Sequence, residues 1–279
     1  MTAVRLERKF VEKIWGRRDL GSGFDAVPKD RAPIGEVWFQ EPAGPDRDLL
    51  IKYLFTSERL SIQVHPDDAA ARALGFVRGK DEAWVVLTAE PGAVIGMGLH
   101  RSVSREELRA SAMNRTLEDL VHWRSVRSGD IFYSPAGTIH AIGAGLTLVE
   151  VQQNLDVTYR LYDYGRPREL HLEQGIAAAH AQSCSASFEP FSLSHGRQIV
   201  ANGPAFTLER WTGSPHGHVE ANGEPVSIIC LAGTGTIDGE ELRPGNVWLV
   251  EDQTKLAISD DADLLVAYAG REVRQDLAT

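Results

Sequence analysis

The stretch that decides the fold of this chain reads Gly129-Asp130-Ile131-Phe132-Tyr133-Ser134-Pro135-Ala136-Gly137-Thr138-Ile139-His140. It places one histidine just past a turn that contains proline and glycine, with strand-like hydrophobic sequence on both sides. Glycine permits the tight turn, and proline fixes the backbone φ angle ahead of it. We expect His140 to lie on the returning strand, where its imidazole can reach the middle of a barrel and bind a metal ion.

Partners for His140 lie upstream in the sequence. Residues 60–66, Leu-Ser-Ile-Gln-Val-His-Pro, alternate apolar and polar side chains, so Gln63 and His65 face the same side of a strand. Glu82 follows at the start of the next predicted strand, which contains β-branched residues. Imidazole, carboxylate and amide oxygen suit zinc, with cobalt, nickel, iron or manganese as alternatives, and such a site leaves a position for water or substrate. The predicted metal ligands are Gln63, His65, Glu82 and His140.

A metal site competes with a simpler interpretation of each histidine. A single histidine at a strand end is more often a packed or hydrogen-bonded side chain. The joint occurrence of two histidines, a glutamine on the same face and a glutamate beside turn residues favours a metal site. The rival pair, His216 and His218, sits in a Gly/Pro-rich stretch with no acidic residue at suitable spacing, which favours a solvated loop.

Two levels of resemblance follow from these motifs. The spacing G-x5-P-x-G-x2-H over residues 129–140 resembles the second motif of the cupin superfamily, although Ala144 stands at that family's later asparagine position. Four ordered segments are similar to the signatures of type I mannose-6-phosphate isomerases. They are Leu60-Ser-Ile-Gln-Val-His-Pro-Asp-Asp68, Gly79-Lys-Asp-Glu82, Pro135-Ala-Gly-Thr-Ile-His-Ala-Ile-Gly143 and Glu150-Val-Gln-Gln-Asn-Leu-Asp-Val-Thr-Tyr-Arg-Leu-Tyr-Asp-Tyr164.

This resemblance implies a fold, a metal and an activity. It implies one Zn²⁺ held by Gln63, His65, Glu82 and His140. It also implies an isomerase that interconverts mannose 6-phosphate and fructose 6-phosphate through an enediol intermediate. Aldose–ketose interconversion removes a proton beside a carbonyl, and a divalent cation with a nearby guanidinium can stabilise the resulting negative charge.

Further site residues come from strand position and from the same resemblance. Arg160 lies on the alternating strand after the His140 turn, and its family counterpart lines the active site. Lys80 is two residues before Glu82, and its counterpart is also an active-site residue. For the phosphate we expect Ser61, which shares the face of Gln63, and Arg166, which closes the next turn, to form a clamp. For Arg166 a solvated turn charge is the alternative.

Composition narrows the class of protein. The formal charge of −10 over 279 residues argues against a nucleic-acid surface, so a phosphorylated substrate needs a local basic pocket. No segment reaches the length of apolar sequence that spans a membrane, and the N-terminal residues lack the apolar run of a signal peptide. The two cysteines, Cys184 and Cys230, form no CxxC motif, so we expect packed thiols in a cytoplasmic protein. The oligomeric state stays open.

The organisation predicted from turns and periodicity is all-β. Short strands separated by Gly, Pro and Asp-rich turns indicate two cupin (jelly-roll) β-barrels with a small helical insert on the first. We expect residues 1–182 to form the catalytic cupin domain and residues 183–279 a smaller, metal-free one. Helical pattern occurs in three places: Pro66–Leu74, the insert at about 104–120, and Glu169–Ala179.

Two other functions remain open at this point. One is a different metal-dependent cupin enzyme, either an isomerase of another sugar phosphate or an oxygenase. The other is a non-catalytic cupin that binds sugar. A barrel of this kind hosts many functions, so the fold alone does not choose among them.

Overall fold

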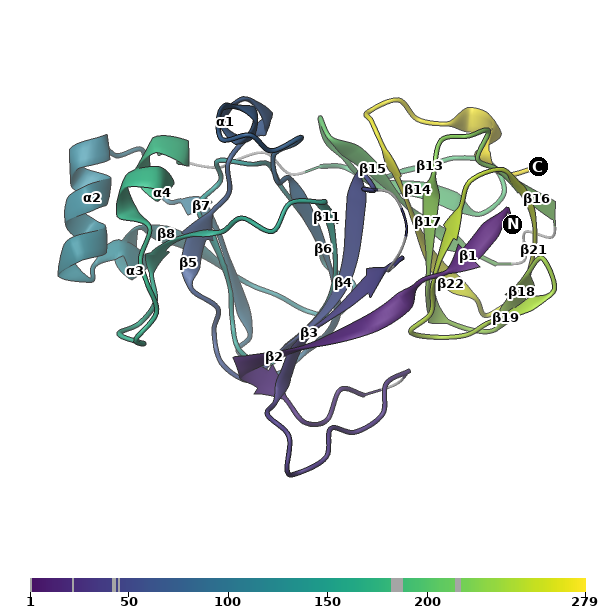
Figure 1. Cartoon of the computed structure of the whole chain (residues 1–279), viewed down its shortest axis with the longest axis horizontal. Coiled ribbons are helices and arrows are strands. Elements are labelled where there is room, and N and C mark those ends of the chain that lie inside the picture. Colours follow the sequence, from purple (N-terminus) through teal and green to yellow (C-terminus); the bar gives the residue numbers. More distant parts are fainter. Residues whose placement is uncertain (1, 22, 42–43, 45, 182–187, 214–216) are drawn as a thin grey trace.

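Two β-barrels lie side by side in the computed structural model (Figure 1). The structure describes residues 2–21, 23–41, 44, 46–181, 188–213 and 217–279. Strands dominate these residues and every strand pair is antiparallel, as the alternating sequence pattern predicts. The expected all-β class is therefore confirmed.

The first barrel is built from two sheets. A six-stranded sheet has the order β2-β3-β4-β11-β6-β9, and a five-stranded sheet has the order β12-β5-β10-β7-β8. Their bounds are β2 Glu7–Arg17, β3 Ile34–Gln40, β4 Leu49–Thr56, β5 Ile62–Val64, β6 Glu82–Ala89, β7 Val94–Leu99, β8 Val121–Ser125, β9 Ile131–Ser134, β10 His140–Ile142, β11 Leu146–Gln153 and β12 Tyr159–Tyr162.

Short helices flank the first barrel, and all three predicted helical regions are present. Their bounds are α1 Asp68–Ala73, α2 Arg105–Asn114, α3 Leu117–Leu120 and α4 Leu172–Ala178. The Ser104 hydroxyl caps α2 by accepting from the Glu107 amide. The insert is two helices because Arg115 adopts a left-handed backbone (φ 68°), which ends α2 before α3 starts. In Figure 1, α2, α3 and α4 lie on the side of the first barrel away from the second.

The second barrel contains a seven-stranded sheet, β1-β20-β17-β22-β15-β14-β13, and a four-stranded sheet, β16-β21-β18-β19. The bounds are β1 Ala3–Arg5, β13 Phe191–Ser192, β14 Arg197–Asn202, β15 Phe206–Thr212, β16 Gly217–Glu220, β17 Val226–Ala232, β18 Gly235–Ile237, β19 Glu240–Leu242, β20 Val247–Val250, β21 Gln253–Ile258 and β22 Asp263–Ala269, with a 3₁₀ turn at Gln275–Leu277. The N-terminal strand β1 pairs with β20 of this barrel. The predicted division at residue 182 falls outside the described residues and stays a prediction.

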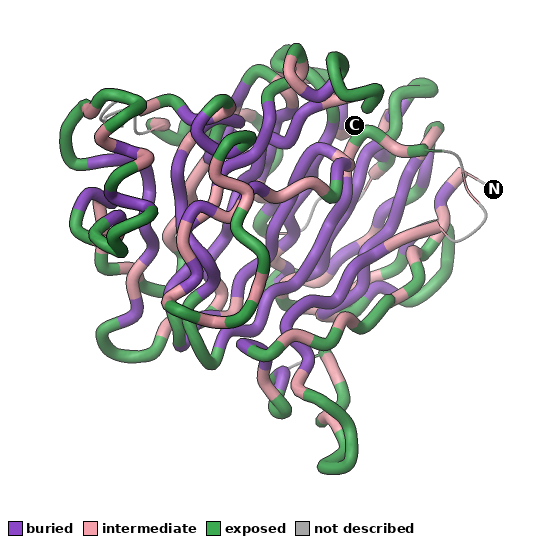
Figure 2. Tube along the Cα trace, turned by 60° about the vertical axis from the view of Figure 1, so that its left-hand side comes forward, coloured by how far each residue is buried: buried purple, intermediate pink, exposed green. Residues whose placement is uncertain are grey.

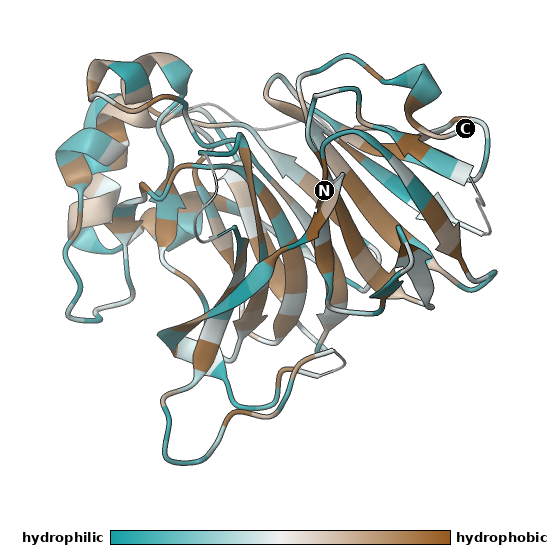
Figure 3. Ribbon diagram, turned by 45° about the vertical axis from the view of Figure 1, so that its right-hand side comes forward, coloured by the Kyte–Doolittle hydropathy of each residue, from teal (hydrophilic) through white to brown (hydrophobic). Residues whose placement is uncertain are grey.

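One hydrophobic core lies between the two barrels. Buried side chains of β3, β4, β6 and β11 pack against those of β14, β15, β17, β20 and β22. Figure 2 shows buried segments running through both facing sheets, and Figure 3 shows apolar residues along the same strands. Because neighbouring residues of a strand point to opposite faces, the other face of β4 and β6 is free to line the interior of the first barrel.

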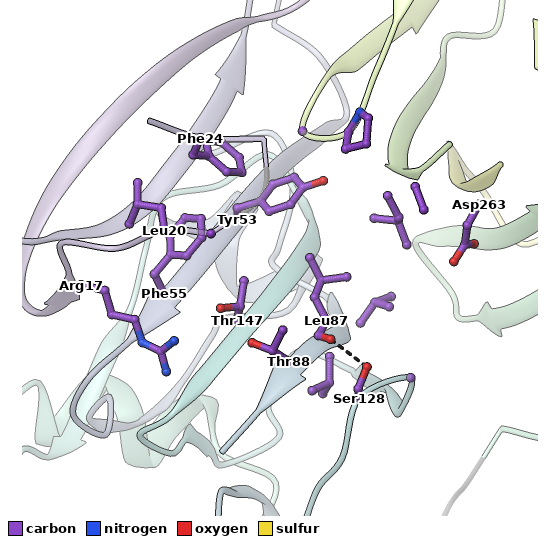
Figure 4. Close-up of a pocket in the computed structure, with 18 of the residues that line it drawn as sticks. Arg17, Leu20, Phe24, Tyr53, Phe55, Leu87, Thr88, Ser128, Thr147 and Asp263 are labelled. Atoms are coloured by element: carbon purple, nitrogen blue, oxygen red, sulfur yellow. Dashed lines mark hydrogen bonds between the residues drawn. The ribbon is translucent and has the colours of Figure 1, made fainter. Parts of the chain in front are cut away.

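A cavity of about 430 Å³ lies at the seam between the barrels (Figure 4). Phe24, Tyr53 and Phe55 line one side of it, while Leu231 and Asp263 come from the second barrel. None of the four predicted metal ligands lines this cavity. The candidate site therefore lies elsewhere, on the interior face of the first barrel.

Candidate metal centre

Three strands bring the predicted ligands together inside the first barrel. Gln63 of β5 lies directly opposite His140, the first residue of β10, and His65 follows the end of β5. Glu82 is the first residue of β6. The two histidines are each 1% exposed and Glu82 is 2% exposed, so the side chains meet in the interior rather than at the surface.

The distances define a compact cluster. The Nε2 atom of His65 lies 3.3 Å from Glu82 Oε1, and the Nε2 atom of His140 lies 3.4 Å from Glu82 Oε2. Ligand atoms of these three residues all lie within 4.8 Å of one another, which is close enough to share an ion. The Gln63 side-chain nitrogen is 3.3 Å from His140 Nε2, so its amide must turn over to present oxygen to an ion.

The Nδ1 atom of each imidazole is hydrogen-bonded to a backbone carbonyl, which leaves Nε2 available to bind a metal ion. His65 Nδ1 lies 2.8 Å from the carbonyl oxygen of Val157, and His140 Nδ1 lies 2.9 Å from that of Thr138. A carbonyl oxygen only accepts, so each Nδ1 carries the hydrogen and each Nε2 presents a lone pair towards Glu82. This is the orientation that metal-binding histidines adopt in proteins.

The protonation states of the two histidines and the glutamate also favour binding of a cation. Burial, together with the Lys80 charge, lowers the pKa of His65 to about 4. Burial likewise lowers the pKa of His140. Burial opposes ionisation of Glu82, yet the charge of Lys80 holds its pKa well below the ordinary value. Two neutral imidazoles and one carboxylate are the forms that coordinate a divalent ion.

Lys80 lies in the same cluster, as the sequence predicts. Its ammonium is 3.0 Å from Glu82 Oε1 and 3.4 Å from His65 Nε2, and the residue is 4% exposed. The charge of Lys80 therefore offsets that of the Glu82 carboxylate inside the barrel.

Arg160 lies on the neighbouring strand β12, on the same face of the sheet as Gln63. It is the direct partner of Gln63 in the β12–β5 pairing, and directly opposed residues project from the same face of a sheet. Its Nε atom is buried and has no hydrogen-bond partner among the described residues. A buried donor without a partner is costly, so this guanidinium is suited to receive an anionic or oxygen-rich ligand.

The two predicted phosphate contacts differ in their surroundings. Ser61 is buried, and its hydroxyl donates to Gln63 Oε1 over 3.1 Å. Arg166 instead donates from Nη2 to Asp163 Oδ1 over 2.7 Å, and Arg168 shares the same buried carboxylate. The structure thus joins Ser61 to the cluster and holds Arg166 in a separate ion pair, so a phosphate contact by Arg166 remains a prediction.

A buried polar group beside the cluster escaped the sequence analysis. Lys52 of β4 lies 3.3 Å from Glu150 Oε1 of β11, and the indole of Trp84 donates to Glu150 Oε2 over 3.0 Å. Trp84 also packs against the His140 ring, with centroids 5.2 Å apart. The available signal was a lysine and a glutamate inside mostly apolar strand sequences, Leu49–Phe55 and Leu146–Val151.

The remaining sequence candidates lie outside this cluster. His216 and Cys184 lie outside the described residues, while His218 is on β16 of the second barrel. Within the described residues, His65, Glu82 and His140 are the one group of three that could hold an ion. In the same part of the chain, no helix has the length and apolar content that crossing a membrane requires.

Sequence comparison relates the chain to mannose-6-phosphate isomerases. No family model matches it. It is 36% identical over 201 residues to the mannose-6-phosphate isomerase of Streptococcus mutans, covering 68% of this chain and 62% of that enzyme, which is less than two thirds of its length. It is 33% identical to a Bacillus subtilis mannose-6-phosphate isomerase over 67% of that protein. A putative mannose-6-phosphate isomerase of B. subtilis is 30% identical over 93% of this chain and 96% of its own length.

Comparison with solved structures supports the same relationship. The crystal structure of the B. subtilis mannose 6-phosphate isomerase has a TM-score of 0.82 and 26% identity, covering 96% of this chain and 99% of that one. A mutant of phosphomannose isomerase from Salmonella typhimurium has a TM-score of 0.75 at 15% identity, which shows the shared fold. The predicted cupin-type arrangement of two barrels is that of these proteins.

Proposed function

The chain belongs to the mannose-6-phosphate isomerase family, and we propose that it interconverts mannose 6-phosphate and fructose 6-phosphate. The observation that carries this proposal is the buried cluster of His65, Glu82 and His140. Arg160 lies opposite Gln63 on the neighbouring strand, and its buried Nε atom has no hydrogen-bond partner among the described residues. The cluster suits a divalent ion, and the guanidinium suits an oxygen that gains negative charge. Each of them can stabilise the enediolate that forms during aldose–ketose isomerisation.

We propose one Zn²⁺ per chain, held by His65, Glu82, His140 and the amide oxygen of Gln63. Two imidazoles with oxygen ligands are typical of catalytic zinc sites, although the same donors accept cobalt, nickel, iron or manganese. When bound, such an ion acts as a Lewis acid that polarises the sugar carbonyl.

Arg160 and Lys80 have separate roles in the proposed reaction of the sugar phosphate. Arg160 donates to the sugar oxygen on which negative charge develops as the enediol forms, and the burial of its Nε atom strengthens that bond. Lys80 keeps Glu82 ionised and orients it, because its ammonium is 3.0 Å from the carboxylate. The barrel excludes bulk water from these charges.

For the phosphate end of the substrate, Ser61 and Arg166 are the proposed contacts. Ser61 is within hydrogen-bond distance of Gln63 and so lies next to the proposed ligands. Arg166 would bind phosphate while it also pairs with Asp163, which offsets part of its charge. We therefore expect Arg166 to affect the KM for the sugar phosphate more than kcat.

A coupled assay with mannose 6-phosphate tests the proposal. We expect turnover in the Zn²⁺-loaded protein, loss of turnover after chelation, and recovery when Zn²⁺ is restored. Arg160→Ala should abolish most of the activity and leave Zn²⁺ binding intact. The control is Arg210→Ala, which removes an arginine paired with Asp263 in the second barrel and should keep activity.

Each negative result has a specific meaning. Binding of mannose 6-phosphate without turnover would favour a sugar-binding protein. Failure to bind any phosphorylated sugar by a Zn²⁺-loaded protein would favour a different metal-dependent enzyme. We also propose a cytoplasmic location, which the low cysteine content supports and which fractionation of cells would test.

A further inference from the structure

Hydrogen bonds connect the turn between β9 and β10 to His65, to His140 and to the residue that precedes Glu82. The Gly137 amide donates to the carbonyl oxygen of His65 over 2.9 Å. The Ala136 amide donates to Asp81 Oδ1 over 2.8 Å, and Asp81 directly precedes Glu82. The same turn supplies the Thr138 carbonyl that holds the His140 ring. The position of this turn therefore affects all three side chains together.

Asp81 is the residue that joins this turn to the strand carrying Glu82. It is 7% exposed, and its amide donates to Gln153 Oε1 over 2.9 Å while its carbonyl accepts from the Gln153 amide over 3.0 Å. Its second carboxylate oxygen accepts the hydroxyl of Tyr133 over 2.6 Å. A buried carboxylate with these partners has little freedom to move.

Tyr133 extends this connection to the second barrel. It lies on β9 opposite Ala83 and packs on Phe206 of β15, with ring centroids 5.0 Å apart. A Cβ atom added at Gly203 would lie 1.8 Å from the Tyr133 Cζ atom, so the ring touches the backbone of the second barrel. No side chain larger than hydrogen fits at Gly203 while Tyr133 keeps this place.

We propose that Asp81 is a positioning residue for the metal ligands and that the second barrel holds it in place through Tyr133. Coordination requires each ligand atom to be placed within a few tenths of an ångström, and residues that orient ligands affect affinity strongly. This inference rests on the proposed metal centre. It gives the second barrel, which carries no ligand of the proposed set, a specific effect on that centre.

The matched test compares two tyrosines that donate to buried carboxylates. Tyr133→Phe removes the hydroxyl from Asp81, and the control Tyr268→Phe removes the 2.8 Å bond to Glu209 inside the second barrel. Zn²⁺ affinity is measured by competition with a chromophoric chelator, and the absorption spectrum of the Co²⁺-loaded protein reports ligand geometry. We expect Tyr133→Phe to weaken Zn²⁺ binding by roughly 10–100-fold and to alter the spectrum, whereas Tyr268→Phe changes neither.

A second variant changes the second barrel where it contacts Tyr133. Gly203→Ala should displace the Tyr133 ring and weaken Zn²⁺ binding in the same direction. The inference is overturned if Tyr133→Phe keeps wild-type Zn²⁺ affinity and an unchanged Co²⁺ spectrum, or if Tyr268→Phe weakens binding equally. If Gly203→Ala fails to fold, the tyrosine pair decides the result alone.

The metal readout separates this inference from the proposed function. A protein that binds Zn²⁺ but turns over no sugar phosphate would refute the function, and the effect of Tyr133→Phe on Zn²⁺ affinity would still support the inference. An active enzyme in which Tyr133→Phe leaves Zn²⁺ affinity unchanged would refute the inference alone. A wild-type protein that binds no divalent ion would refute the inference together with the metal part of the function.

Discussion

Replacing Lys52 with methionine should destabilise the first barrel by leaving a buried carboxylate without its cation. Lys52 is 4% exposed, and its ammonium lies 3.3 Å from Glu150 Oε1 and 3.9 Å from Glu36 Oε2. Methionine keeps most of the volume, so packing against Trp38 changes little. The expected loss is therefore electrostatic.

The geometry sets the size of this loss. Two unit charges 3.3 Å apart attract by about 5 kcal/mol at an effective dielectric constant of about 20. Removing one partner of a buried pair costs about 3–5 kcal/mol, because the other charge stays desolvated. Burial and Glu82 already raise the pKa of Glu150, and loss of Lys52 would raise it further. Protonated Glu150 relieves the cost, so the destabilisation should be larger at about pH 8 than at about pH 5.

Urea unfolding of the metal-free protein at both pH values measures these effects. The double variant Lys52→Met with Glu150→Gln removes the unpaired charge and should recover most of the stability. The reasoning would be refuted by a Lys52→Met protein as stable as wild type at about pH 8, or by a loss that grows as the pH falls.

Three further predictions concern the site and its surroundings. Glu82→Gln should lower Zn²⁺ affinity at least tenfold, which isothermal titration calorimetry would measure, because the ligand charge is lost. Gly137→Ala should destabilise the turn and weaken Zn²⁺ binding, since Gly137 has φ +82° and a Cβ would lie 2.7 Å from the His180 ring; unchanged binding would contradict this account of the turn. Ser104→Ala should cost about 1 kcal/mol of unfolding free energy by removing the cap of α2, with no change in Zn²⁺ affinity.

Local sequence determined most of the elements and the chemistry of the cluster. Period-two alternation placed Gln63 of β5 and His65, which directly follows β5, on one face, and the Pro/Gly turn placed His140 at the start of β10. The types of side chain indicated a metal site before any distance was known. These features are local because strand faces and turns depend on residues that are neighbours in the chain.

The tertiary structure alone decided which distant residues meet. Sheet register pairs Lys52 with Glu150, long-range packing puts Tyr133 of the first barrel on Phe206 of the second, and β1 crosses to pair with β20. The break in the predicted helical insert also depends on the left-handed conformation of Arg115. The sequence does not indicate this break, because the residue at that position is not a glycine. Sequence patterns specify the face on which a side chain lies, whereas its partner depends on the packing of the whole chain.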